Sequence, residues 1–210
     1  MNKQTVLEII GREKLIPVIR TDNTDDARKA VEMLVSCGFR IFEITMTVPD
    51  ATTLIAELNK EDLLIGAGTV LDKSSAERCV ESGARFIVSP AFDAETVNFC
   101  NERKISVMPG SLTPAEVLSA WNAGADCVKI FPCDALGGAK YLKTLKTLFP
   151  HIPMMPTGGV TLESIADFFD AGAFAVGVGT DLVDVKAIRE GNSESVVKKA
   201  REYLEIVKNV

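Results

Sequence analysis

Short apolar runs rich in β-branched residues recur along the whole chain, and polar segments separate them. Runs of this length are typical of β-strands that are buried on both faces. Between them, apolar residues recur at helical spacing, as at Ala27, Ala30, Val31 and Leu34, so strands and amphipathic helices alternate. The predicted strands cover residues 15–20, 41–46, 64–70, 86–90, 106–109, 127–131, 154–157 and 175–179.

Helix limits are marked by capping residues and by glycine. Thr113-Pro-Ala-Glu116 and Ser74-Ser-Ala-Glu77 both have the form of a capping box, in which a hydroxyl and a glutamate satisfy the first backbone N–H groups. Glycine follows four helical segments a few residues before the next strand, as expected of a helix C-terminus. These glycines are Gly38, Gly83, Gly124 and Gly172.

Alternation of strand and helix requires parallel strands with right-handed crossovers. Such units can close into a barrel or form an open doubly wound sheet. The first loop lacks the Gly-x-Gly-x-x-Gly dinucleotide fingerprint, and eight short units in 210 residues fit a compact barrel. We therefore predict an α/β protein, a single (β/α)8 TIM barrel over residues 1–210, with an additional N-terminal helix at residues 3–12.

The net charge and the cysteine content limit the kinds of molecule that the protein is expected to bind. The net charge is −6 and the pI is about 5.0, which argues against nucleic acid because its binding needs a basic face. No apolar run is long enough to span a bilayer, and charges interrupt the N-terminus too early for a signal peptide. The five widely spaced cysteines indicate reduced thiols. We expect a cytoplasmic protein that binds a small molecule, with no membrane partner.

In βα-barrels the carboxyl ends of the strands carry function, and strand residues alternate between the interior and the helices. Val128 and Ile130 suit the helix layer, so Lys129 points inward, where burial favours a neutral amine able to attack a ketone. The same alternation turns Glu43 inward as its natural partner, able to shuttle protons. The alternative is a structural ion pair, with Glu43 bound to Lys129 or Arg20.

Other polar residues and glycines follow the same strand ends. Arg20 ends the first strand and offers a fork for a carboxylate or phosphate, or else a rim salt bridge. Thr69, in Gly-Ala-Gly-Thr-Val70, offers a hydroxyl to a ligand. Two glycine loops, Pro-Thr-Gly-Gly-Val160 and Gly-Val-Gly-Thr180, occupy the position of barrel phosphate sites, although turn formation alone could explain their glycines.

Several residues suited to catalysis lie elsewhere. His151, the only histidine, falls between a helix and the next strand, on the opposite face of the barrel, and Trp121 lies inside a helix. We expect a surface role for the first and packing for the second. Cys133 follows the strand of Lys129 and is expected near the mouth. No metal-binding motif is present, so we expect neither a metal nor a cofactor.

Five motifs in order carry a resemblance to a known family: Glu-Ile-Thr-Met-Thr-Val-Pro49, Gly-Ala-Gly-Thr-Val70, Val-Ser-Pro90, Val-Lys-Ile-Phe-Pro132 and Pro-Thr-Gly-Gly-Val160. Over nearly its whole length the chain resembles the KDPG/KHG aldolase family. The resemblance implies a class I aldolase, commonly a homotrimer, that splits 2-dehydro-3-deoxy-6-phosphogluconate into pyruvate and glyceraldehyde 3-phosphate without metal.

The resemblance also assigns roles to residues. Lys129 matches the Schiff-base lysine and Glu43 the general acid/base. Phe131, two residues after the lysine, would shield the imine from water. The matching substrate-binding positions are Arg20, Thr69 and Pro90 at the keto-acid end and Thr157, Gly158, Gly159, Gly179 and Thr180 at the phosphate end.

One departure from the family leaves the substrate open. Some members carry an arginine where this chain has Thr47, so carboxylate recognition would fall to Arg20 and Thr69. Aldolases acting on 4-hydroxy-2-oxoglutarate or on 2-dehydro-3-deoxy-6-phosphogalactonate are same-class alternatives. A phosphate-binding isomerase or epimerase would keep the glycine loops but use other bases, and a non-catalytic binding barrel would not need Lys129 and Glu43 facing inward together.

Overall fold

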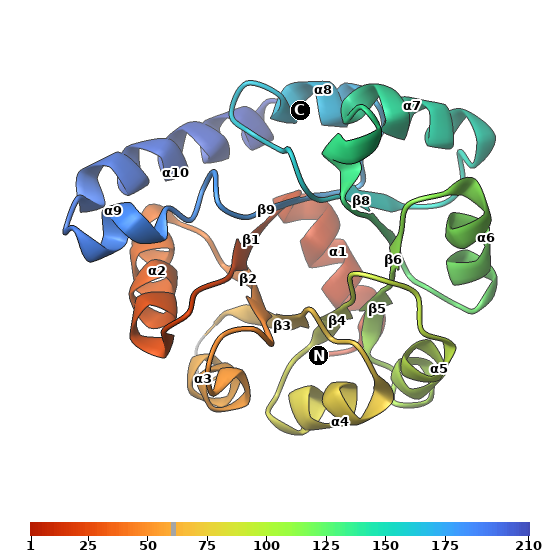
Figure 1. Ribbon diagram of the computed structural model, residues 1–210, viewed down its shortest axis with the longest axis horizontal. Coiled ribbons are helices and arrows are strands. Elements are labelled where there is room, and N and C mark those ends of the chain that lie inside the picture. The colour runs from red at the N-terminus through yellow and green to blue at the C-terminus, as the bar shows by residue number, and fades with distance from the viewer. Residues whose placement is uncertain (60–61) are drawn as a thin grey trace.

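The computed structural model describes residues 1–59 and 62–210, in which strands and helices alternate (Figure 1). The strands are β1 (Leu15–Ile19), β2 (Ile41–Thr45), β3 (Leu64–Gly68), β4 (Phe86–Val88), β5 (Ser106–Met108), β6 (Gly110–Ser111), β7 (Val128–Ile130), β8 (Met154–Pro156) and β9 (Val176–Val178). The helices are α1 (Lys3–Glu13), α2 (Thr24–Cys37), α3 (Ala51–Leu58), α4 (Lys73–Glu81), α5 (Ala94–Glu102), α6 (Pro114–Asn122), the 3-10 helix η1 (Cys133–Leu136), α7 (Ala139–Leu148), α8 (Ile165–Asp170), α9 (Val185–Arg189) and α10 (Ser193–Lys208).

The strands form a curled parallel sheet. Six pair in the order β5-β4-β3-β2-β1-β9, and three more in the order β6-β7-β8, with every pairing parallel. Each predicted strand segment contains a strand, and the fifth is continued by the short β6 after Pro109. Beyond β8, an isolated parallel bridge joins Thr157 to Gly177 of β9. In Figure 1 the other helices lie around the outside of the strands, whereas α1 lies in the middle of the curved sheet.

Alternation along the strands divides the core into two layers. In β2, Phe42 and Ile44 pack in the large cluster between the strands and the helices, whereas Ile41 belongs to a smaller cluster on the concave side of the sheet. In β7, Val128 and Ile130 likewise lie in the large cluster, as predicted. Since side chains alternate along a strand, Glu43 and Lys129 share the concave side with Ile41.

The smaller cluster, here called the inner cluster, is apolar and is covered by the first helix. Val6 and Ile10 of α1 are buried at 2% and 0% exposure against the strands. Burying such a side chain contributes about 1.5–3 kcal/mol relative to exposure. The residues of the inner cluster that lie in the strands or immediately before them are Ile16, Ile41, Leu64, Phe86, Val88, Met108, Cys127, Met155 and Ala175. Because most of them come from the starts of strands, α1 covers the amino ends and leaves the carboxyl ends open.

Helix caps agree with the sequence at one of two predicted capping boxes. The Thr113 hydroxyl accepts from the Glu116 N–H, and the Glu116 side chain accepts from the backbone of Thr113, as predicted. The prediction for Ser74 is wrong, because α4 begins at Lys73 and Asp72 is its N-cap, accepting from the Ser75 N–H at 2.7 Å. Asp72 lies nearer the end of β3, and its carboxylate caps as well as a hydroxyl does.

The helices of the described chain are short or amphipathic. None of them, within residues 1–59 and 62–210, is both long and apolar enough to cross a bilayer.

The four glycines predicted to end helices, at positions 38, 83, 124 and 172, all have positive φ, between 92° and 114°. Glycine adopts this conformation without the steric cost that a side chain would add, so these glycines end helices as expected.

Candidate active site

Two buried, oppositely charged side chains meet on the concave side of the sheet. Lys129 from β7 and Glu43 from β2 place Nζ and Oε1 3.6 Å apart, and their side chains are 3% and 0% exposed. Neither Glu43 oxygen accepts a hydrogen bond from the described residues. A carboxylate so deeply buried and so sparsely bonded is costly, which makes a purely structural role for it unfavourable.

Glycines in the two neighbouring strands allow close packing around this pair. A Cβ at Gly68 of β3 would lie 2.0 Å from Glu43 Oε1, and a Cβ at Gly110 of β6 would lie 2.2 Å from the Pro90 carbonyl. Gly110 is the register partner of Lys129. The space that Glu43 occupies therefore exists because β3 carries no side chain at Gly68, whereas the missing side chain at Gly110 lets the backbone of Pro90 approach β6 closely.

The aromatic ring of Phe131 covers the lysine. Its centroid lies 5.1 Å from Lys129 Nζ. Phe131 also lines two cavities at the carboxyl ends of the strands, so it lies at the boundary between the buried amine and the space where a ligand fits. An aromatic face at this distance attracts a cation and keeps water away from the amine.

Arg20 and Thr69 lie beside each other, as their proposed common role requires. The Arg20 guanidinium donates to the Thr69 hydroxyl at 3.3 Å, and Thr69 has φ 56°, a conformation unusual for a threonine. Thr47 lines a shallow depression with Arg20, and its hydroxyl shares a hydrogen bond of 2.8 Å with Thr45. Thr47 thus occupies space next to Arg20 without offering a second positive charge.

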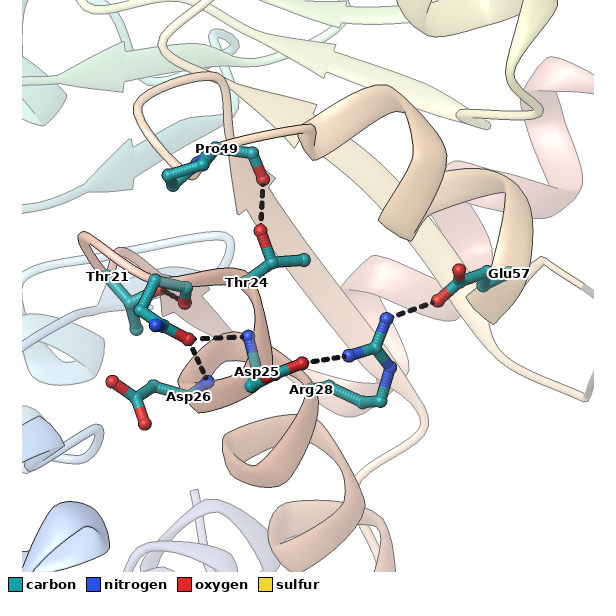
Figure 2. A network of polar contacts seen from close by, with 8 residues as sticks. Thr21, Thr24, Asp25, Asp26, Arg28, Pro49 and Glu57 are labelled. Carbon is teal, nitrogen blue, oxygen red and sulfur yellow. Dashed lines mark hydrogen bonds and ion pairs between the residues drawn. The ribbon is translucent and has the colours of Figure 1, made fainter.

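The loop that follows Arg20 is tied to the loop that follows β2. Figure 2 shows Arg28 bridging two carboxylates, with 2.8 Å to Asp25 and 2.7 Å to Glu57 of α3. The Thr24 hydroxyl donates to the Pro49 carbonyl at 2.6 Å. The exposed ion pair between Arg28 and Glu57 links α2 to α3 and contributes little by itself. The Thr24 contact joins the start of α2 to the loop that carries Thr47.

The other side of the Arg20 loop is held by α9. Arg189 Nε donates to Asp26 at 2.7 Å, and the same guanidinium binds Asp22. Asp26 is buried at 8% exposure, so its charge needs this partner. The loop after β1 is therefore fixed from both sides.

One cavity, here called the main cavity, has a volume of about 430 Å³ and is lined by Phe131, the residue whose ring lies over Lys129. Most of the predicted substrate residues line it, whereas Lys129 and Glu43 lie behind its wall. Pro90 lines a separate cavity of about 240 Å³ that shares only Phe131 with the main one. The predicted residues of the main cavity are Arg20, Phe131, Thr157, Gly158, Gly159, Gly179 and Thr180.

The first glycine loop is shaped by close packing on η1. Gly158 and Gly159 have φ 91° and 70°, and a Cβ at either would lie 2.9 Å or 2.4 Å from Asp134. Both positions require glycine, so backbone rather than side chains faces the cavity. The helix after this loop, α8, starts only at Ile165, so the loop backbone itself, not a helix end, lines the cavity.

Two features of the cavity were not found from the sequence. Asp181 lines it directly after Thr180, and its carboxylate is bound by two residues of α10. The Thr157 hydroxyl is buried and has no hydrogen-bond partner among the described residues. The sequence could have indicated Asp181, because it directly follows the second glycine loop. It could not have indicated that the Thr157 hydroxyl lacks a partner, because this depends on packing against Gly177.

The residues that the sequence analysis placed away from the active site have no side chain in it. His151 is exposed before β8 and meets the Trp121 ring edge-on at 6.0 Å between centroids. The backbone of Cys133 lies next to the cavity, since its N–H donates to the Thr157 carbonyl at 3.0 Å, but its side chain is fully buried in η1. Burial, and then the nearby Asp134, raise the pKa of its thiol to about 12, so it is unreactive at neutral pH. No group of three His, Cys, Asp or Glu in the described chain could hold a metal ion.

The arrangement defines a class of protein. A buried amine, a carboxylate within proton-transfer reach and an adjoining cavity at the carboxyl ends of parallel strands are the parts of a lysine-dependent enzyme on an α/β scaffold. A family model described as "Aldolase: KDPG and KHG aldolase" matches residues 6–199. The chain belongs to the KDPG and KHG aldolase family.

Individual relatives agree with this assignment. A 2-dehydro-3-deoxy-phosphogluconate aldolase of Haemophilus influenzae is 32% identical, with 98% of each chain covered. A 2-dehydro-3-deoxy-6-phosphogalactonate aldolase of Escherichia coli is also 32% identical, covering 92% of this chain and 96% of the relative. The crystal structure of a Legionella pneumophila KDPG aldolase, with pyruvate captured as a covalent carbinolamine, superposes with a TM-score of 0.85 at 28% identity, covering 96% and 97% of the two chains.

Proposed function

We propose that this aldolase cleaves 2-dehydro-3-deoxy-6-phosphogluconate reversibly into pyruvate and glyceraldehyde 3-phosphate through an imine on Lys129, without metal or cofactor. The observation that carries the proposal is the pair of Lys129 and Glu43, buried together 3.6 Å apart beside the main cavity. A lysine and a carboxylate held together in this way supply both the nucleophile and the proton carrier that the reaction needs.

The scaffold we propose for this chemistry is one closed eight-stranded barrel over residues 1–210, with α1 covering its amino end. Only Pro109 separates β5 from β6, so the two short strands continue one another along the chain. The bridge between Thr157 and Gly177 connects the end of β8 to β9. These two links support closure of the curled sheet into a ring.

The chemistry proceeds from the amine. Lys129 gives its proton to Glu43 and its amine attacks the C2 ketone. Glu43 returns the proton as the carbinolamine loses water, and the protonated imine accepts the electron pair released when C3–C4 breaks. Glu43 removes the proton of the C4 hydroxyl, so that the aldehyde leaves. The remaining enamine is protonated at C3, and water hydrolyses the imine to release pyruvate. Phe131 keeps bulk water from the imine while the bond breaks.

Substrate recognition divides between two ends of the site. We assign the keto-acid carboxylate to the forked guanidinium of Arg20, supported by its bond to Thr69, with Pro90 behind it in the adjacent cavity. Backbone N–H groups bind the phosphate, because the glycine loops expose backbone to the cavity. The residues assigned to the phosphate end are Thr157, Gly158, Gly159, Gly179 and Thr180.

The same mechanism serves two related substrates. 4-Hydroxy-2-oxoglutarate lacks phosphate and would leave the glycine loops unused, whereas the 6-phosphogalactonate analogue differs only in configuration. The glycine loops favour a phosphorylated substrate as the principal one. The assembly we expect is a homotrimer in the cytoplasm, on the basis of the family resemblance and of five free cysteines.

Reductive trapping tests the proposal directly. Incubation with pyruvate and borohydride is expected to leave a reduced pyruvyl adduct on Lys129, located by peptide mass spectrometry. Lys129→Ala removes the adduct, whereas Lys143→Ala, which removes an exposed lysine of α7, leaves it in place. Absence of an adduct on folded wild-type protein would exclude the imine mechanism. Cleavage rates of the three candidate substrates then rank their specificity.

A further inference from the structure

Asp181 is an acidic side chain in the wall of a cavity expected to bind an anion. It follows the second glycine loop, and it is the one acidic residue among the described residues that line the main cavity, where Arg20 is the one basic residue. Its side chain is 28% exposed, so it can contact a ligand in the cavity as well as neighbouring residues of the protein.

Two residues of α10 bind this carboxylate from behind. The Tyr203 hydroxyl donates to Oδ2 at 2.6 Å, and Lys199 Nζ lies 3.3 Å from Oδ1. Tyr203 is fully buried, so its hydroxyl depends on this acceptor. A carboxylate has about four acceptor positions, and these two contacts use half of them. Because Asp181 lines the cavity and is partly exposed, we assign the remaining positions to the cavity side.

The chemistry of a fixed carboxylate at this place differs from that of the glycine loops. It accepts hydrogen bonds from hydroxyl groups strongly, and it repels a phosphate dianion. Lys199 offsets that repulsion because its charge lies next to the carboxylate. The balance between Asp181 and Lys199 therefore sets how much negative charge the end of the cavity tolerates.

We propose that Asp181 is a specificity-determining residue that accepts a hydrogen bond from a hydroxyl of the aldehyde half of the substrate and weakens the preference for phosphate, with Lys199 restoring it. The proposal rests on the aldolase function proposed above. It gives the enzyme measurable activity toward hydroxyl-terminated aldehydes such as glyceraldehyde, besides the phosphorylated one.

The test compares two aldehydes in the condensation with pyruvate: D-glyceraldehyde 3-phosphate and D-glyceraldehyde. The measured quantity is the ratio of kcat/KM for the phosphorylated aldehyde to kcat/KM for the other. Asp181→Asn keeps the shape but removes the charge, and we expect the ratio to rise roughly tenfold. Lys199→Met removes the offsetting cation, and we expect the ratio to fall roughly three- to tenfold.

Lys198→Met is the matched control, because Lys198 is the neighbouring residue on α10, 77% exposed and paired only with Glu202 in the described chain. It should leave the ratio within about twofold of the wild-type value. Opposite shifts in the Asp181→Asn and Lys199→Met proteins support the proposal. Equal losses for both aldehydes in both variants would show that Asp181 only anchors the loop, and would overturn it.

A second measurement separates this outcome from failure of the aldolase function. Borohydride trapping of pyruvate involves no aldehyde, so the Lys129 adduct should form at wild-type levels in all three variants. If Asp181→Asn does not fold, the Lys199→Met ratio decides alone, since a partly exposed lysine is replaced without leaving Tyr203 unpaired. An unchanged ratio in that protein would overturn the proposal.

Discussion

The two halves of the concave side are built from the same strands and differ sharply in chemistry. Toward the amino ends, the inner cluster is entirely apolar and α1 covers it. Toward the carboxyl ends, the same strands present Glu43, Lys129 and Thr157, of which Glu43 and Thr157 have side-chain oxygens without hydrogen-bond partners among the described residues. The first half is dominated by apolar packing, whereas the second keeps buried polar atoms without partners.

β7 shows the difference within two residues. Cys127, immediately before β7, and Lys129 lie two residues apart and point to the same side, yet the first belongs to the inner cluster and the second meets Glu43. Because the scaffold is stabilised by the apolar half, the polar half can keep buried charges that cost free energy. Substitutions should therefore separate activity from stability according to the half in which they fall.

The largest effect is expected in the polar half, at Glu43. Glu43→Gln keeps the shape of the side chain but removes the proton acceptor, and kcat for cleavage should fall by about 10²- to 10⁴-fold. The pyruvate adduct on Lys129 should still form, since the substitution leaves the amine in place. Steady-state kinetics and trapping together measure the two steps.

Glu32→Gln removes an exposed carboxylate of α2 and serves as the control, with kcat unchanged. A Glu43→Gln protein that retains kcat within about threefold, far less than general acid–base catalysis contributes, would contradict the role of Glu43 as proton carrier. The ion pair with Lys129 would then be structural.

The contrast between the halves was partly visible in the sequence. Alternation in Ile41-Phe-Glu-Ile-Thr45 and in Cys127-Val-Lys-Ile-Phe131 identified which side chains face inward, because a period of two leaves only one choice once the apolar partners are placed. The lysine and the glutamate could therefore be predicted as neighbours from strands that are far apart along the chain.

Other features depend on contacts that no local pattern encodes. Asp181 is bound by Tyr203, 22 residues further on, through the packing of α10. Pro90 follows a strand end like Arg20, but it lines a different cavity because Phe131 stands between the two. At the start of α4, Asp72 and Ser74 could each serve as N-cap, and Asp72 does so because it lies nearer the end of β3. Each of these three features is determined by tertiary packing and not by the local preferences of the residues.

In the apolar half, we expect a change in stability without a change in chemistry. Ile10→Ala deletes most of a side chain that is 0% exposed, and the free energy of unfolding should fall by about 2–5 kcal/mol, as measured by urea denaturation. Because α1 lies at the amino ends, kcat of the folded protein should not change.

Glu8→Ala, on the exposed face of the same helix, should change stability by less than about 0.5 kcal/mol. A loss of kcat in folded Ile10→Ala protein would show that the two halves are coupled. The separation argued above would then be wrong.

The smallest effect concerns Cys127, an inner-cluster residue that immediately precedes β7. Complete burial raises the pKa of its thiol well above the ordinary value of 9.0. In the unfolded chain the thiol loses its proton above about pH 8.5, whereas the folded protein keeps it, so the unfolded state binds fewer protons and the free energy of unfolding falls as pH rises. The stabilising contribution is complete below about pH 8.5.

Cys127→Ala should make the free energy of unfolding fall less steeply between about pH 9 and 10, by up to about 1.4 kcal/mol per pH unit, as measured by urea titrations at each pH. Equal slopes in the two proteins would mean that the thiol ionises as readily in the folded state, and that water reaches the inner cluster.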